Sequence, residues 1–149
     1  MNIMSSLFHD LDGFLQASQF KDAWADDGCV YANRLLFDFS DEDWQNLAAV
    51  IEGRGELWKL SLAQALSGIT THQAISSLIS LLRELDEDIF YEAALTLEEN
   101  IRSGAEIVIP PSEIQTLIEQ MKLQTGKEFL GVWSLEAQMM RLTTKKGHP

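Results

Sequence analysis

Two stretches, WKLSLAQAL at residues 58–66 and IFYEAALTL at residues 89–97, repeat one pattern 31 residues apart. The offset pairs Trp58 with Ile89, Ala63 with Ala94, and Leu66 with Leu97. Upstream, the same offset relates Trp44, Leu47, Val50 and Ile51 to Ile75, Leu78, Leu81 and Leu82. A fixed period of 20–50 residues is typical of stacked helical repeats. We therefore predict that helix pairs form the centre of the chain.

The two stretches resemble the second helix of a HEAT-type repeat. In that pattern a large apolar residue and a basic residue precede paired small residues and a closing leucine. Lys59 occupies the basic position in the first copy, and Phe90 replaces it in the second. The resemblance covers residues 41–101 and, more loosely, residues 112–142. It implies an all-α, HEAT-like α-solenoid of about three antiparallel helix pairs. Such a fold does not determine a function.

At 149 residues the chain is predicted to be a single domain. Residues 1–39 are expected to form an amino-terminal helical cap, with helices near residues 7–15, 18–25 and 30–37. Residues 40–142 hold the repeats, and residues 143–149, TTKKGHP, form a polar tail that we expect to be disordered. No alternating strand pattern persists for more than a few positions, so about eight or nine helices are expected.

Polar residues mark the predicted helix starts. Ser40 precedes three carboxylates in a first turn, where acids complement the helix dipole. Capping boxes are predicted at Thr70 with Gln73, Ser112 with Gln115, and Thr125 with Glu128. Pro110 and Pro111 indicate the start of the last pair. The insertion at residues 103–109, SGAEIVI, is predicted to be a loop or a short extended segment.

The core is predicted from helical spacing. In the third pair, Ile114, Leu117, Ile118 and Met121 should face inward, followed by Val132, Ala137 and Met140 in the last helix. Trp24, Trp44 and Trp58 are expected in the core. Trp133 comes one residue after Val132, so it either joins the core or points outward.

The search for catalytic and metal-binding motifs favours a protein that is not an enzyme and carries no metal or cofactor. The sequence has no phosphate-binding glycine loop, G-x-S-x-G, H-E-x-x-H or C-x-x-C. His9, His72 and His148 are scattered, and the single Cys29 excludes an intrachain disulfide. The run at residues 86–88 begins like a calcium loop, but Phe90 takes the next ligand position. Without a signal sequence or an apolar span, a cytoplasmic location is expected.

The charge balance indicates the class of partner. A net charge of -12 and a pI near 4.5 disfavour nucleic acid and anionic membranes and favour a basic protein. Acids gather at Asp38, Asp41, Glu42 and Asp43, and again at Glu84, Asp86, Glu87 and Asp88. The predicted partner-binding residues are Asp86, Asp88, Tyr91, Glu92, Glu99, Asp41, Asp43 and Trp133. The alternative is that these acids cap helices and keep the protein in solution.

Small size, acidity and the lack of catalytic motifs make the chain similar in type to the immunity proteins of bacterial contact-dependent inhibition and other polymorphic toxin systems. That resemblance implies a monomer that neutralises a basic toxin, a nuclease domain, in a 1:1 complex. One alternative is a general HEAT-type scaffold or adaptor. Another is a lyase-like or chaperone role on bilin-carrying proteins, which needs a ligand-binding cleft that the sequence does not show.

Overall fold

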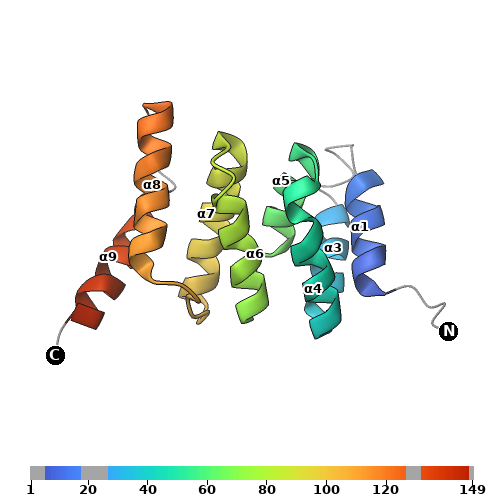
Figure 1. Cartoon of the computed structure of the whole chain (residues 1–149). Coiled ribbons are helices and arrows are strands. Elements are labelled where there is room, and N and C mark those ends of the chain that lie inside the picture. Colours follow the sequence, from blue (N-terminus) through green and yellow to red (C-terminus); the bar gives the residue numbers. More distant parts are fainter. Residues whose placement is uncertain (1–5, 18–26, 127–131, 148–149) are drawn as a thin grey trace.

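The computed structural model describes residues 6–17, 27–126 and 132–147, and within these ranges the chain is helical without strands. The all-α prediction is therefore confirmed. The elements are α1 (Leu7–Ala17), α3 (Cys29–Phe37), α4 (Asp41–Val50), the 3₁₀ turn η2 (Ile51–Gly53), α5 (Glu56–Ala65), α6 (His72–Leu82), α7 (Glu87–Arg102), α8 (Pro111–Thr125) and α9 (Trp133–Gly147) (Figure 1). The helix predicted near residues 18–25 lies outside the described residues.

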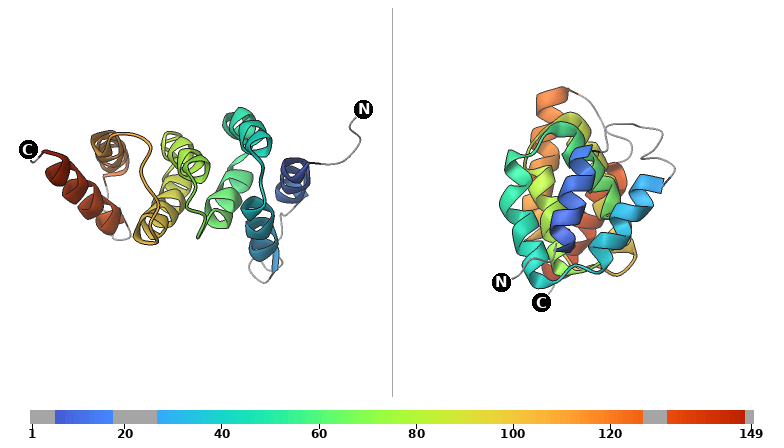
Figure 2. Two further views of the ribbon diagram at one scale, coloured as in Figure 1. Left: turned by 90° about the horizontal axis from the view of Figure 1, so that it is seen from below. Right: turned by 90° about the vertical axis from the view of Figure 1, so that its right-hand side faces the viewer.

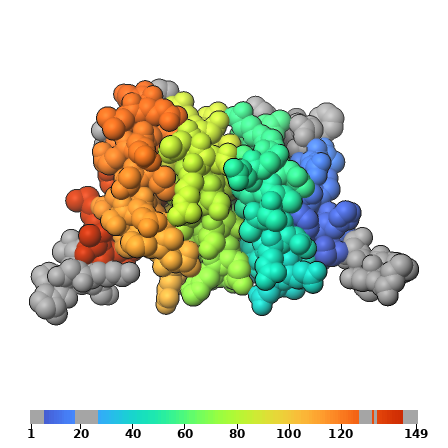
Figure 3. All heavy atoms as spheres, in the orientation of Figure 1, coloured from blue at the N-terminus to red at the C-terminus, as the bar shows by residue number. Residues whose placement is uncertain are grey.

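The helices alternate between two layers. Helices α4, α6 and α8 form one layer, and α3, α5, α7 and α9 form the other (Figure 2). Within the second layer α5 contacts α3 and α7, and α7 contacts α9. Helix α1 packs on α3, α4 and α5 at the amino-terminal end. Figure 3 shows the face that α8, α6 and α4 cover.

The residues predicted to face inward between residues 44 and 101 form the core. Trp44 and Trp58 are 7 % and 4 % exposed, as expected. Helices α5 and α7 contact one another, and each contributes small, fully buried residues: Ala63 and Ala65 from α5, and Ala93 and Ala94 from α7. Side chains of this size let helix axes approach closely. The larger Phe90 of α7 is also fully buried.

The last helix differs from its prediction. Leu135, Gln138 and Met139 are buried, whereas Ala137 and Met140 are exposed, so the predicted inward face was wrong beyond Val132. Helix α9 also continues to Gly147, through most of the segment that we expected to be disordered. Helix α9 has few large apolar residues, so its weak match to the repeat could not predict which of its sides faces the core.

Three of the predicted helix starts need correction. Thr71, not Thr70, caps α6, because its hydroxyl oxygen accepts a hydrogen bond from the Ala74 N–H. Helix α8 begins at Pro111 rather than after Ser112. Thr125 is the last residue of α8, where its hydroxyl donates to the Met121 carbonyl. Helix α4 starts after Ser40 as predicted, and Ser40 caps it. The insertion at residues 103–109 forms a loop.

Two asparagines hold the carboxyl end of α5 from opposite sides. Asn100 of α7 is fully buried, donates to the carbonyls of Leu66 and Ile69, and accepts from the Gly68 N–H at 2.7 Å. Asn33 of α3 donates to two further carbonyls at this end, those of residues 65 and 67. Gly68 has a φ of 82°, which glycine adopts at little cost. The last carbonyls of a helix have no partners within the helix, so these side chains fix α5 against both neighbours.

A charged cluster joins α1 to the start of α5. Arg54 donates two hydrogen bonds to the carboxylate of Asp12, at 2.9 and 2.6 Å, and the Trp58 indole N–H donates a third at 3.0 Å. The Arg54 guanidinium also lies 5.7 Å from the centre of the Trp58 ring. The hydrogen bonds from Arg54 hold the pKa of Asp12 below its ordinary value, although burial opposes the shift. The ionised carboxylate is therefore the stabilising form.

Acid should weaken this cluster. The folded pKa of Asp12 is lowered, so its contribution is complete above the unfolded pKa of about 3.9 and is lost as the pH falls through the folded value. We expect Asp12→Asn to lose about 1.5–3 kcal/mol of unfolding free energy at pH 7. The difference between Asp12→Asn and wild type should shrink below about pH 4. Urea unfolding from pH 7 to pH 3 measures both effects, and a difference independent of pH would contradict this role.

Candidate protein-binding surface

The alternation of the helices brings two turns to one edge of the molecule. The turn from α4 to α5 and the turn from α6 to α7 lie at the same edge, the upper one in Figure 1. Six carboxylates belong to these turns and to the first residues of α5 and α7. We call them the acidic edge: Glu52, Glu56, Glu84, Asp86, Glu87 and Asp88.

Three members of the acidic edge come into direct proximity. Oxygen atoms of Glu56, Asp86 and Asp88 all lie within 4.8 Å of one another. Each residue has a local reason to be acidic, because all three lie at helix amino termini, where the dipole favours negative charge. Asp86 also caps α7, since its Oδ1 accepts hydrogen bonds from the N–H groups of residues 88 and 89. The contact between α5 and α7 then places these acids together.

The cations nearest in sequence are engaged with other carboxylates. Arg54 pairs with Asp12 at 2.6 Å, Lys59 with Glu84 at 2.6 Å, and Arg83 with Glu113 at 3.5 Å. Within the described ranges, none of these pairs includes Glu56, Asp86 or Asp88. Like charges this close raise the local negative potential. The cluster is therefore the part of the acidic edge where electrostatic attraction of an external cation is strongest.

Exposed apolar groups adjoin this charge. Tyr91, on the outward side of α7, is 37 % exposed, and Leu57 at the start of α5 is 51 % exposed. Asp88 and the half-buried Glu92 lie on the same side of α7 as Tyr91, at helical spacing. Protein interfaces commonly combine an aromatic or aliphatic anchor with surrounding charge. The surface that the sequence predicted on α7 thus gains Glu56 and Leu57 from α5.

Two other predicted residues lie away from this cluster. Glu99 follows Asp88 by three turns of α7, about 16 Å along the helix, and its carboxylate accepts a hydrogen bond from the Ser67 hydroxyl. Asp41 begins α4 at the opposite edge and accepts a hydrogen bond from the Gln73 amide. These residues therefore belong to a different part of the surface.

The assignment of Asp43 to the partner-binding surface was wrong. Asp43 is 5 % exposed, and its carboxylate accepts hydrogen bonds from the N–H groups of Ser40 and Phe8. These hydrogen bonds keep its pKa below the ordinary value although burial, the largest single influence, raises it. Asp43 thus caps α4 and fixes it to α1. Trp133 is the first residue of α9, and its side chain lies outside the described part.

The residues that could support metal binding or catalysis do not form a single site. The oxygens of Glu56, Asp86 and Asp88 could converge on a metal ion, but exposed acids often lie this close without one. His9 and His72 are exposed on different helices. Burial raises the pKa of the Cys29 thiol, which lowers its reactivity.

Sequence reasoning missed Glu56, although the repeat itself carried the signal. The offset that aligns Trp58 with Ile89 also aligns Glu56 with Glu87. Equivalent positions of stacked repeats are neighbours in space, so the start of α5 had to lie beside the start of α7.

Comparisons of the chain with family models, curated proteins and solved structures found no match. Among the described helices, none has both the length and the apolarity needed to cross a membrane.

Proposed function

We propose that this chain is an immunity protein that binds a basic toxin, a nuclease domain, and neutralises it through the acidic edge. The observation that carries the proposal is the cluster of Glu56, Asp86 and Asp88, whose oxygens lie within 4.8 Å of one another beside the exposed Tyr91 and Leu57. Arginine or lysine side chains of a partner would relieve the mutual repulsion of these carboxylates, and Tyr91 and Leu57 would supply apolar contact.

The charge of the whole chain supports the same proposal. Opposite net charges can raise association rates by factors of about 10 to 1,000 at low salt, and a protein of net charge -12 attracts a basic partner from a distance. An inhibitor of a toxin benefits from fast capture, because a single free toxin molecule acts until it is bound. A nuclease needs a basic surface to hold its substrate, so an acidic inhibitor fits either that surface or one adjoining it.

The proposal includes a HEAT-like solenoid as the architecture. Its support is the 31-residue period, the alternation of helices between two layers and the contacts of each helix with its neighbours. In this proposal α1 and α3 form the amino-terminal cap, and the acidic edge is built from equivalent turns of consecutive repeats. The protein acts as a cytoplasmic monomer.

The gene immediately upstream provides the test. If it encodes a large secreted protein with a variable carboxyl-terminal domain, expression of that domain alone should be toxic, and co-expression of this chain should restore growth. The purified pair should form a 1:1 complex whose association slows by about tenfold or more when salt is raised from 20 to 200 mM. Failure to protect and failure to bind that domain would contradict the proposed function. Binding without protection would favour the scaffold alternative.

A further inference from the structure

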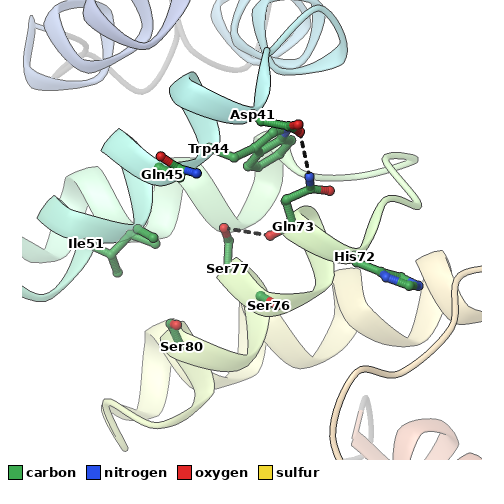
Figure 4. Close-up of a pocket in the computed structure, with 10 residues that line it drawn as sticks. Asp41, Trp44, Gln45, Ile51, His72, Gln73, Ser76, Ser77 and Ser80 are labelled. Atoms are coloured by element: carbon green, nitrogen blue, oxygen red, sulfur yellow. Dashed lines mark hydrogen bonds between the residues drawn. The ribbon is translucent and has the colours of Figure 1, made fainter.

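A groove of about 470 Å³ separates α4 from α6 on the face opposite α5 and α7. Figure 4 shows residues of α4, including Trp44 and Gln45, on one side and residues of α6, including Ser76 and Ser80, on the other. A second hollow of about 270 Å³ shares Ala48, Ile51 and Ser80 with it and continues to Glu52 and Glu84. The groove therefore runs along α4 and opens at the acidic edge.

Small side chains explain why the groove is open. Ala48, Ser76 and Ser80 line it, and none of them is long enough to fill the space between the two helices. The nearly buried Trp44 and Ile51, 7 % and 3 % exposed, provide its apolar floor. Its walls thus combine hydroxyl and amide groups with an apolar base.

The polar walls favour an extended peptide over a helix. A helix satisfies its own backbone N–H and C=O groups, whereas an extended segment needs external donors and acceptors. Gln45, Gln73, Ser76 and Ser80 offer both kinds of group along the groove. The groove follows α4 and the start of η2 from Asp41 to Glu52, about 16 Å at about 1.5 Å per residue, which is the length of about five extended residues.

The two ends of the groove determine the charge of its occupant. The exposed Asp41 lies at one end, next to Trp44 and Gln73 (Figure 4). At the other end Glu84 pairs with Lys59 at 2.6 Å and Arg83 pairs with Glu113 at 3.5 Å, so the exposed Glu52 is the carboxylate there that neither pair includes. His72 also lines the first end, and its imidazole is 3.9 Å from Glu106. Carboxylates at both ends and an apolar floor match a segment with a basic residue at each end and small apolar residues between.

We propose that this groove binds an extended segment of about five residues from the basic partner, with one cationic side chain at Asp41 and another at Glu52. The proposal rests on the proposed function for the basic character of the partner. It adds a second contact surface that is continuous with the acidic edge. The segment would enter at the acidic edge and follow α4 toward Asp41.

The probe is the peptide Gly-Arg-Ala-Leu-Ala-Arg-Gly, blocked at both termini and titrated into the ¹⁵N-labelled full chain in 150 mM salt. We expect saturable shifts at the amides of Ala48, Ser76 and Ser80. Asp41→Lys and Ser76→Trp should each weaken binding by about tenfold or more, the first by charge and the second by filling the groove. Thr116→Trp, on the exposed side of α8, is the matched control and should bind within about twofold of wild type. A peptide with Glu in place of both Arg residues should bind at least about tenfold more weakly.

Three outcomes would overturn the groove proposal: equal binding by Asp41→Lys and Ser76→Trp, equal binding of the Arg and Glu peptides, or shifts confined to Glu56 and Asp88. Circular dichroism establishes that each variant is folded. A Glu56→Lys/Asp88→Lys variant separates the two proposals, because it should lose protection in cells while binding the peptide within about threefold of wild type. If that variant still protects, the acidic edge is not the surface that binds the toxin, and the groove proposal stands.

Discussion

Replacing Asn100 with leucine should lower the free energy of unfolding by about 3–5 kcal/mol. The side chain is fully buried and makes three hydrogen bonds to the carboxyl end of α5, to Leu66, Gly68 and Ile69. Leucine is similar in size but cannot replace any of them, so the Ile69 carbonyl and the Gly68 N–H lose this partner, while the Leu66 carbonyl keeps only its hydrogen bond from the Ile69 N–H. Each buried polar group left without a partner costs about 1–3 kcal/mol. Urea unfolding at pH 7 measures the loss.

Asn33→Leu provides the control for this prediction. Asn33 binds the same end of α5 from the opposite side, through two hydrogen bonds of 2.7 Å, but it is only half-buried. Water can reach the carbonyls that it leaves, so a loss of about 1–2 kcal/mol is expected. If Asn100→Leu costs less than about 1 kcal/mol, the end of α5 does not depend on α7.

Reversing charge at the acidic edge should abolish protection of cells by this chain. A Glu56→Lys/Asp88→Lys/Glu92→Lys variant removes two carboxylates of the cluster and one beside Tyr91. Each carboxylate desolvated against an arginine or lysine can contribute several kcal/mol to binding, so affinity should fall by a factor of about 1,000 or more. Glu56 and Asp88 are exposed and Glu92 is half-buried, and carboxylates at the surface contribute little to folding, so the melting temperature should remain within a few degrees. Growth in the presence of the toxin and binding by calorimetry measure the two effects.

The matched control carries the same change in net charge elsewhere. In Asp38→Lys/Glu42→Lys/Glu106→Lys all three positions are exposed and lie outside the acidic edge. Glu42 is the second residue of α4, and Asp88 is the second residue of α7. Each variant therefore places one lysine in the first turn of a helix, where the helix dipole disfavours positive charge. The control should associate more slowly than wild type at low salt but still protect. If both variants protect equally well, the acidic edge is only solvated surface.

The helical spacing of apolar residues predicted most of the helices, because this spacing depends only on residues close in sequence. A helix must bury its apolar stripe, so the spacing of Trp44, Leu47, Ile75 and Leu78 already identifies the buried side of α4 and α6. The same argument failed in α9, where Met140 fitted the spacing and is exposed while the polar Gln138 is buried. Spacing shows only which side of a helix is more apolar on average. Helix α9 has too few large apolar residues for the spacing to predict which side faces the core.

Polar partners could not be predicted in this way, because they depend on which helices lie next to one another. No pattern in the sequence singled out Asn100, and Asp43 was predicted to bind a partner, yet both are buried and bind backbone groups about 30 residues or more away. Hydrogen bonds act over about 3 Å, far less than the distance between helix axes. A hydrogen-bond partner in another helix is therefore known only once the helices are packed.

Composition and local spacing were enough to predict the helical class, the 31-residue repeat, the net charge of -12 and the acids at the start of α7. None of these properties requires knowledge of the packed chain. The folded chain was needed to see that Glu56 joins Asp86 and Asp88, that Asp41 and Glu99 lie apart from them, and that a groove opens between α4 and α6. Spacing along the chain could not predict these features, because charge repulsion and open space depend on distances between separate helices, and helix packing sets those distances.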